Sequence, residues 1–351
     1  MLKWTDVAEA FIITTVVSYL IMPFMRMVAL RTNFVDHPKD NKVHARPIPL
    51  LGGVGIYLAF MIGAFSNLGI FQDPRWMGIF IGATVLLVIG LIDDRMGMMP
   101  EIKLLAQILA AMAVVKSGVR VEFLQNYYLN TVLTYIWIVG ITNSFNLLDN
   151  MNGLSAGIAV IASGFFGIIM LSSNQVEIAV ISFAVTGSCL GFLKHNFPKA
   201  NIFMGDSGSL VIGFILASLG ILGSWKTKFL TTSLAMPVLV LAYPIFDTTL
   251  VTIMRLLEGR SIFQGGKDHS SHRLALLSFR KRKAVLVIYI ICVLLGLSAL
   301  VIQRVHIRAA FAIIAVVILF LTALGVRLGM VNTGRFGRKK KDNGKRKDKG
   351  S

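Results

Sequence analysis

The chain has 351 residues, of which 55% are hydrophobic and only 15% charged, and its mean hydropathy is +0.74. Water-soluble domains carry a smaller apolar share, so this composition excludes an ordinary soluble fold. The net charge is +18, but the basic residues are spread over the loops of an apolar chain without an aromatic-rich soluble domain, and we therefore expect no nucleic-acid partner.

Apolar runs of about 17–22 residues recur along the chain between short polar segments. Each run is long enough to cross the hydrocarbon core of a bilayer, about 30 Å thick, as an α-helix. We therefore predict an all-α, polytopic membrane protein with about eleven transmembrane helices. The runs are centred near Val16, Leu58, Val85, Leu109, Ile136, Ile161, Ala184, Ile215, Leu239, Ile290 and Val316.

Lys and Arg are frequent in every second connection and in the C-terminal tail, and sparse in the other connections. Basic loops stay on the cytoplasmic side, so an odd number of spans predicts an external N-terminus and a cytoplasmic C-terminus. We interpret residues 1–330 as one transmembrane catalytic domain and 331–351 as a basic, disordered cytoplasmic tail. The basic connections lie around 31–46, 95–103, 194–199 and 255–283.

Five predicted cytoplasmic connections carry dense polar motifs. In the first, Lys42, His44 and Arg46 present cationic donors that suit phosphate groups, and Gly52 and Gly53 allow a tight turn into the next span. The three basic residues are therefore candidates for substrate binding, with an ordinary positive-inside loop as the alternative.

The second motif is the pair Asp93-Asp94, which directly ends an apolar run. Adjacent carboxylates repel each other unless they share a cation or a proton, and carboxylate oxygens suit Mg²⁺. Both residues are thus candidates for metal binding or catalysis, with a plain polar helix end as the alternative.

The third motif contains Asn146, Asp149 and Asn152, three polar residues at a spacing of three. On a helical or 3₁₀ turn this spacing places them on one face and gathers their oxygens. A cap for the helix that begins after Gly153 would need only one of them. The spacing favours a functional cluster over helix capping.

The fourth connection contains Asn196, a candidate for substrate binding, and leads into the stretch 205–209, which reads Gly-Asp-Ser-Gly-Ser. Because this stretch opens an apolar helix, its backbone N–H groups and the positive end of the helix dipole are suited to a phosphate, with Asp206 beside them as a metal ligand. The alternative is that Asp206 or Ser207 only caps the helix.

The fifth and longest connection contains Arg260, His269, His272 and Arg273. Two His residues three apart are compatible with zinc, but no Cys or further His joins them, so contacts to a diphosphate fit better. A solvated basic loop is the alternative. Asp247, in the apolar run before this connection, is either a functional carboxylate or a structural one paired with a loop Arg or Lys.

Taken in order, the motifs resemble those of a known family. They read His44-x-Arg46-Pro47 with Gly52-Gly53, Asp93-Asp94, Asn146-x-x-Asp149-x-x-Asn152-Gly153-Leu154, Phe203-Met204-Gly205-Asp206-Ser207-Gly208-Ser209 and Asp268-His269-x-x-His272-Arg273. This ordered set is similar to the polyprenyl-phosphate N-acetylhexosamine-1-phosphate transferases of glycosyltransferase family 4. The spacing of the two His residues and the segment 259–263 resemble the bacterial branch that uses UDP-GlcNAc and undecaprenyl phosphate.

The resemblance implies spans packed around a cytoplasmic cleft, one broken or strongly bent helix, here the one that holds Asp247, and commonly a homodimer. Asp206 resembles the principal ligand of Mg²⁺, or of Mn²⁺, with Asn146 or Asp94 nearby. Asp93 resembles the carboxylate that deprotonates or orients the polyprenyl phosphate. Asp149 joins Asp93 and Asp94 as a catalytic candidate.

The resemblance also implies substrate contacts. Asn152 matches a position that contacts uracil, at which many bacterial members have Asp. The motif with His269, His272 and Arg273 resembles the one on the diphosphate side, and Arg260 lies in a loop that resembles the cap over the sugar.

The predicted activity is Mg²⁺-dependent transfer of GlcNAc-1-phosphate from UDP-GlcNAc to undecaprenyl phosphate, with release of UMP, as the first membrane step of cell-envelope polysaccharide synthesis. The active site is predicted to face the cytoplasm from the plasma membrane. Alternative donors are another UDP-N-acetylhexosamine or UDP-MurNAc-pentapeptide. The alternative from another class is an ion-coupled transporter, but transporters place polar groups near the midplane and often show two related halves. Here the carboxylates lie at the ends of the runs.

The predicted orientation is testable by cysteine labelling in intact cells. We expect an impermeant maleimide to label a cysteine placed at Gln72, because this connection carries few basic residues, and to label one at Arg260 only after permeabilisation. Strong labelling at Arg260 in sealed cells would reverse the orientation.

Overall fold

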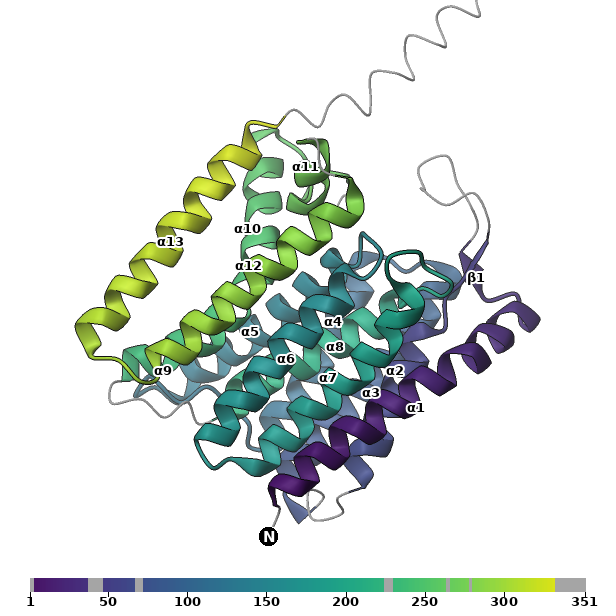
Figure 1. The fold of residues 1–351 in the computed structure, drawn as a ribbon, viewed down its shortest axis with the longest axis horizontal. Coiled ribbons are helices and arrows are strands. Elements are labelled where there is room, and N and C mark those ends of the chain that lie inside the picture. The colour runs from purple at the N-terminus through teal and green to yellow at the C-terminus, as the bar shows by residue number, and fades with distance from the viewer. Residues whose placement is uncertain are drawn as a thin grey trace, which may run out of the picture.

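A computed structural model describes residues 3–36, 47–66, 72–223, 230–262, 266–277 and 280–331 of the chain. The described residues form helices joined by short connections, with one antiparallel pair of two-residue strands (Figure 1). The elements are α1 (Trp4–Arg31), β1 (Val35–Asp36), β2 (Ile48–Pro49), α2 (Gly52–Phe65), α3 (Pro74–Met96), α4 (Pro100–Lys116), α5 (Tyr127–Leu148), α6 (Leu154–Ser172), α7 (Val176–Asn196), α8 (Gly205–Leu222), α9 (Leu230–Val240), α10 (Ala242–Leu257), α11 (Ser270–Leu276), α12 (Lys281–Ile302) and α13 (Ile307–Gly329).

The prediction of an all-α, polytopic membrane protein is confirmed, and every predicted apolar run is centred in a helix. Within the described residues, eight helices are long and apolar enough to cross a membrane. A ninth is added if α9 and α10, which are bent by 72° at their junction, form one broken span. Since α2 has 14 residues and α4 has 17, the count of eleven crossings stays a prediction.

The break between α9 and α10 is the broken helix that the resemblance implied, and Asp247 lies in its second half. Pro237 lies inside α9 and Pro244 in the first turn of α10. Proline removes a backbone hydrogen bond and bends a helix that contains it, which is consistent with the change of direction here.

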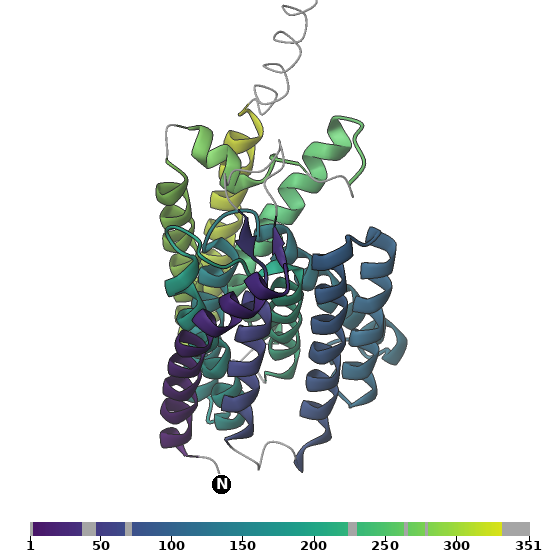
Figure 2. The same ribbon diagram turned by 90° about the vertical axis from the view of Figure 1, so that its right-hand side faces the viewer.

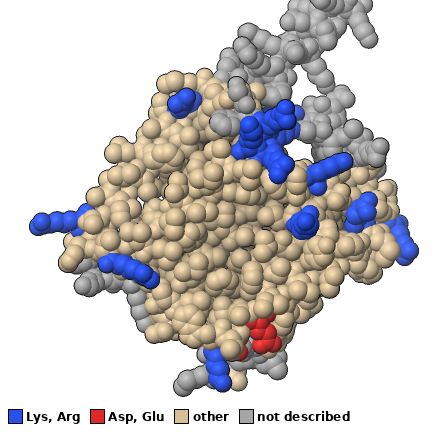
Figure 3. All heavy atoms as spheres, in the orientation of Figure 1, with Lys and Arg blue, Asp and Glu red and all other residues tan. Residues whose placement is uncertain are grey.

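Helix α8 lies at the centre of the bundle, where it packs against α2, α3, α5, α6 and α7. In the apolar 18-residue stretch of α8, 83% of the residues are buried, against 28% in that of α1 and 6% in that of α13. Helices α1 and α13 lie at opposite edges of the bundle (Figure 1). The broad face in Figure 3 is largely without Lys and Arg, which lie mostly toward its margins. Exposed apolar residues on the outer helices fit contact with lipid, because water-soluble monomers rarely expose large continuous apolar patches.

The polar motifs meet at one end of the bundle. They come from the β1–β2 pair, from the C-terminal ends of α3, α5 and α7, and from the N-terminal ends of α8 and α12. Figure 2 shows the N-terminus at the opposite end from the two strands. The predicted tail begins with Val331, and its residues 332–351 lie outside the described residues.

A close approach of backbones joins α2 to α8 at this end. The N–H groups of Gly52 and Gly53 donate to the carbonyls of Phe203 and Met204 at 3.0 and 2.9 Å. A Cβ added to Gly53 would lie 2.3 Å from the backbone nitrogen of Gly208. The Gly-Gly pair is therefore needed for helix packing, and not only for the turn that the sequence suggested.

We expect Gly53→Ala to lower the melting temperature of the detergent-solubilised protein by several degrees, since neither backbone can move aside. Gly140→Ala in α5 is the matched control, because nothing lies within 4 Å of its added Cβ. The control should be neutral or stabilising, as alanine is the better helix former by about 1 kcal/mol. Equal melting curves for both variants would show that the contact does not constrain packing.

Candidate active site

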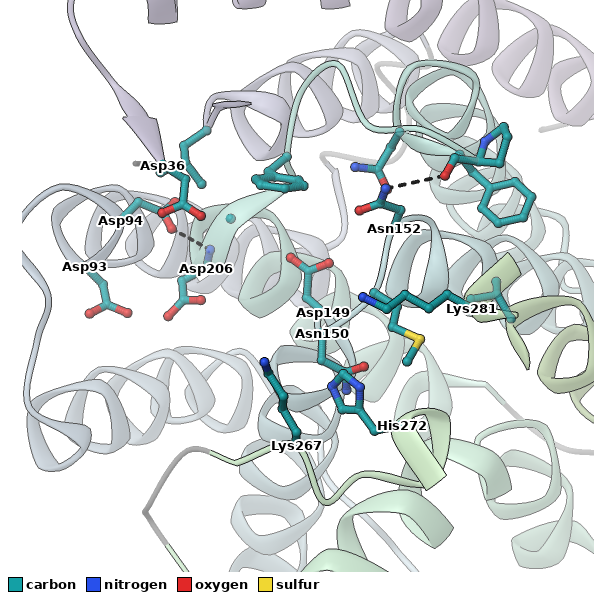
Figure 4. Close-up of a pocket in the computed structure, with 18 of the residues that line it drawn as sticks. Asp36, Asp93, Asp94, Asp149, Asn150, Asn152, Asp206, Lys267, His272 and Lys281 are labelled. Carbon is teal, nitrogen blue, oxygen red and sulfur yellow. Dashed lines mark hydrogen bonds between the residues drawn. The ribbon is translucent and has the colours of Figure 1, made fainter. Parts of the chain in front are cut away.

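A cavity of about 750 Å³ opens where the polar motifs meet (Figure 4). Its walls combine five carboxylates with several amides and basic groups. The lining polar residues are Asp36, Asp93, Asp94, Arg95, Asp149, Asn150, Asn152, Asn196, Asp206, Lys267, His272, Lys281 and Arg282. Residues of the second, third and fourth motifs thus meet in one cavity, although Asn146 of the third motif does not line it.

Asp94, expected as a metal ligand, caps helix α8. Its carboxylate accepts hydrogen bonds from the backbone N–H groups of Asp206 at 2.8 Å and of Ser207 at 3.2 Å. Gly205 precedes them with φ +73°, and a Cβ there would lie 2.4 Å from Asp94 Oδ2. The N–H groups that the sequence offered to a phosphate are therefore engaged by a carboxylate from α3.

Lys103, in the first turn of α4, joins two of the predicted site residues. Its Nζ lies 2.8 Å from Asp93 Oδ2 and 2.9 Å from Asp206 Oδ2. In the sequence, Lys103 is one of the positive charges of a basic connection, and its partners were not predicted. Its position shortly after the Asp-Asp pair, near the start of an otherwise apolar run, was the available signal, since charged residues at span ends are rarely without a partner.

Asp93 is held on both oxygens. Oδ1 accepts the N–H of Met98 at 2.5 Å, and Oδ2 faces Lys103. The backbone carbonyl of Asp93 also accepts the N–H of Gly97, which ends α3 with φ +71°. The turn after α3 therefore fixes the direction in which Asp93 points.

The oxygen ligands present suit a hard divalent cation whose coordination shell is completed by substrate. Among the described residues no three His, Cys, Asp or Glu side chains form a metal-binding group. Mg²⁺, however, is usually held by one or two carboxylates together with phosphate oxygens and water. Asp93 and Asp206, which already converge on the Lys103 ammonium group, meet that requirement.

Asn146, the other expected metal ligand, lies beside the first turn of α8. Its Nδ2 donates to Ser209 Oγ at 3.0 Å, and it is not part of the cavity wall. This hydrogen bond uses the amide nitrogen of Asn146, so its amide oxygen is available for another contact. The structure therefore brings Asn146 next to the helix that carries Asp206, in a supporting position.

Asp149 directly follows α5 and lies in the middle of the cavity, between the Asp93–Asp206 side and Lys281 (Figure 4). Burial, followed by the negative charges of Asp206 and Asp94, raises the pKa of Asp149 to about 8. At neutral pH this carboxyl group therefore keeps its proton in the absence of a cation.

Asn152 and Asn196 connect the third motif to the fourth. Asn196 accepts the N–H of Gly153 at 2.6 Å and donates to the carbonyl of Ile202 at 2.8 Å. Asn152 donates to the carbonyl of Pro198 at 3.4 Å, and its side chain lines the cavity. Asn196 thus positions the loop, while Asn152 remains accessible to a ligand.

Asp247 is a structural carboxylate that is fully buried. It accepts hydrogen bonds from His269 Nδ1 at 2.8 Å, from the N–H of Ser270 at 2.7 Å and from the Ser270 hydroxyl. The structural alternative from the sequence analysis holds, although the partners are a His and a Ser and not the expected Arg or Lys. His269 consequently points behind the cavity wall.

Two further predicted substrate residues also point away from the cavity. Arg273 is almost fully buried and donates to the carbonyls of Leu328, Gly329 and Val331 at 3.0 to 3.3 Å, which caps the C-terminal end of α13. Arg260 pairs with Glu258 and Asp268. Neither Arg lines the cavity, so their predicted contacts to substrate have no counterpart in this arrangement.

Asp268 is the centre of this ion-pair cluster. Arg255 contacts both of its oxygens at 3.0 Å, and both partners are buried. Burial alone would raise the pKa of Asp268, but the hydrogen bonds and charge of Arg255 and the charge of His269 lower it to about 2. The cluster fixes the segment that presents Lys267 and His272 to the cavity.

Lys42, His44 and Arg46 lie outside the described residues. The strands that flank them pair with each other, Val35 opposite Pro49 and Asp36 opposite Ile48. Asp36 and Leu50, at the two ends of this segment, line the cavity.

The comparisons with known proteins agree with the motifs. Residues 76–224 match the model of glycosyl transferase family 4. A Bacillus subtilis protein named "Probable undecaprenyl-phosphate N-acetylglucosaminyl 1-phosphate transferase" is 35% identical over 335 residues, which are 93% of each chain. The chain therefore belongs to glycosyl transferase family 4, and the family predicted from its motifs is confirmed.

Other relatives have related names. The Mycobacterium tuberculosis (H37Rv) "Decaprenyl-phosphate N-acetylglucosaminephosphotransferase" is 32% identical over 81% of this chain and 80% of its own. The Escherichia coli (K12) "Undecaprenyl-phosphate alpha-N-acetylglucosaminyl 1-phosphate transferase" is 27% identical over 83% of this chain and 82% of its own.

The stability of the fold should depend on pH through His272. Burial, followed by the charges of His269, Lys281 and Lys267, lowers the pKa of His272 to about 4. Between pH 6.5 and about 4 the unfolded chain binds a proton that the folded chain resists, so stability falls with acidification by at most about 1.4 kcal/mol per pH unit. Melting temperatures of His272→Gln should fall less steeply over this range than those of wild type. His306→Gln, at an exposed position before α13, is the control and should keep the wild-type slope.

Proposed function

We propose that the protein transfers N-acetylglucosamine-1-phosphate from UDP-GlcNAc to undecaprenyl phosphate or a similar polyprenyl phosphate, with release of UMP. The observation that carries the proposal is the pair Asp93 and Asp206 around the Lys103 ammonium group, in a cavity at one end of a bundle of apolar helices. The names of the relatives support the donor sugar and the lipid acceptor.

In the proposed reaction an oxygen of the lipid phosphate attacks the β-phosphorus of the UDP-sugar. The new P–O bond forms as the bond to the bridging oxygen breaks, and UMP leaves with that oxygen. Phosphoryl transfer of this kind depends mainly on positioning and on neutralising charge. The lipid phosphate is already ionised at neutral pH, so the reaction does not depend on a general base, and Asp93 can serve as a metal ligand.

Asp206 and Asp93 would hold Mg²⁺, or Mn²⁺, and the bound ion would neutralise charge on the diphosphate. Lys103 compensates the negative charge of these two carboxylates, which line the cavity. Asn152 offers both a donor and an acceptor to a uracil edge, next to the side chains of Phe197 and Pro198.

The distribution of polar groups favours an enzyme over a transporter. The carboxylates lie at the ends of α3 and α5 and at the start of α8, and they share one cavity. A coupled transporter would need such groups near the middle of its spans. A nucleotide sugar made in the cytosol requires that this cavity face the cytoplasm, and the basic connections at this end are consistent with the plasma membrane as the location.

The substrate test is UMP release by purified protein from UDP-GlcNAc, UDP-GalNAc and UDP-MurNAc-pentapeptide in turn, with polyprenyl phosphate and Mg²⁺. The proposal expects UDP-GlcNAc to be used and the pentapeptide donor to be rejected. Use of UDP-GalNAc alone would preserve the reaction and change the sugar.

Lys103→Met should reduce kcat about 10²- to 10³-fold, since it removes a positive charge from the point where phosphate charge develops. Lys116→Met, at the exposed C-terminal end of the same helix, should retain wild-type turnover. Turnover is compared at equal amounts of folded protein, because Lys103→Met also leaves Asp93 and Asp206 without their cation. Unchanged turnover in the Lys103 variant would remove this residue from the proposed reaction.

A further inference from the structure

The two long walls of the cavity carry opposite charges. Asp93, Asp94 and Asp206 lie on one side, whereas Lys267, His272 and Lys281 lie on the other, with Asp149 between them (Figure 4). The carboxylate wall contains its own cation, Lys103, and suits a divalent metal. Of the predicted contacts of this region only His272 lines this wall, and its two lysines have no assigned role.

The basic wall is made by two segments that converge. Lys267 precedes α11 and Lys281 is the first residue of α12, and Figure 4 shows both side chains extending into the cavity. Their charges both act on His272, which lies beside them and which stays neutral at physiological pH. The positive charge of this wall therefore comes from lysines.

Like charges that converge in a partly buried site repel each other unless an anion lies between them. Among the described residues no carboxylate forms an ion pair with Lys281. Its position at the start of a 22-residue helix adds the positive end of the helix dipole to the ammonium charge. The wall is therefore suited to bind an anion.

Two anions have this chemistry, the phosphate of the acceptor lipid and the diphosphate of the donor. The position of α12 favours the lipid phosphate. Lys281 and Val285, one turn apart, line the cavity. The neighbouring face of the helix carries Leu286 and Ile290, which are 41% and 60% exposed and thus open to lipid. The start of α12 is consequently the place where the cavity meets the apolar surface of the bundle, and a lipid with a phosphate headgroup can reach Lys281 while its tail stays in the membrane.

We propose that Lys281, with Lys267 beside it, forms a phosphate-binding subsite that holds the monophosphate of the acceptor lipid opposite the carboxylate wall. This assignment rests on the proposed function for its role in turnover. Phosphate binding by the two lysines is a separate property that does not require turnover. The diphosphate of the donor has the same chemistry, so the experiment compares the two substrates directly.

The test compares Lys281→Gln with Lys283→Gln, an exposed lysine two residues further along the same helix that does not line the cavity. We expect Lys281→Gln to raise KM for polyprenyl phosphate about tenfold or more, since it removes a charge-assisted hydrogen bond, with KM for the UDP-sugar unchanged. Lys281→Arg should restore most of the loss, and the Lys283 variant should match wild type.

A binding measurement separates this proposal from the proposed function. Titration of the detergent-solubilised protein with farnesyl phosphate, farnesol and UDP needs no turnover. Loss of affinity for farnesyl phosphate alone in Lys281→Gln supports the subsite even if wild type proves inactive toward every donor. Loss of affinity for UDP instead would assign the wall to the donor, and unchanged affinity for all three ligands would overturn the subsite. If Lys281→Gln melts early, Lys267→Gln provides the same comparison.

Discussion

The hydrogen bonds from the first turn of α8 to Asp94 position the rest of the site. They attach the most buried helix of the bundle to the end of α3, and they place Asp206 beside Asp93. The contact requires three glycines, because a Cβ at Gly53, Gly90 or Gly205 would lie within 2.5 Å of the α8 backbone or of the Asp94 carboxylate. An apolar membrane helix thus begins with a carboxylate cap from a neighbour, and its own aspartate is left for the cavity.

In the last connection, too, some polar residues hold the backbone in place while others line the cavity. Asp247 holds His269, Arg255 holds Asp268, and Arg273 holds the end of α13. Removing one partner of a buried hydrogen bond or ion pair leaves a buried polar group unpaired, which is costly, so each of these contacts favours one geometry. Among the described residues of this connection, Lys267 and His272 are the ones that line the cavity.

The sequence predicted the helices and the end of the bundle at which the motifs meet, because apolar runs and polar motifs are local patterns. It did not predict which side chains face the cavity, since that depends on partners from other helices. Lys103 was missed because its two carboxylate partners lie on α3 and α8. The capping role of Asp94 was not predicted, because the sequence does not show that the N–H groups of α8 approach it. The number of membrane crossings also does not follow from the pattern alone, because α2 has only 14 residues and α4 only 17.

Two walls of opposite charge suit a reaction in which two anions must meet. Unit charges about 4 Å apart repel each other by about 4 kcal/mol at an effective dielectric constant of about 20, and a diphosphate beside a monophosphate involves several such pairs. A single metal on the carboxylate wall would neutralise only part of that charge. If the acceptor phosphate binds the lysines at the start of α12, as proposed, each anion has its own cationic partner before they react. Asp149 lies between the walls, and before a cation binds its raised pKa keeps a further negative charge out of the space between them.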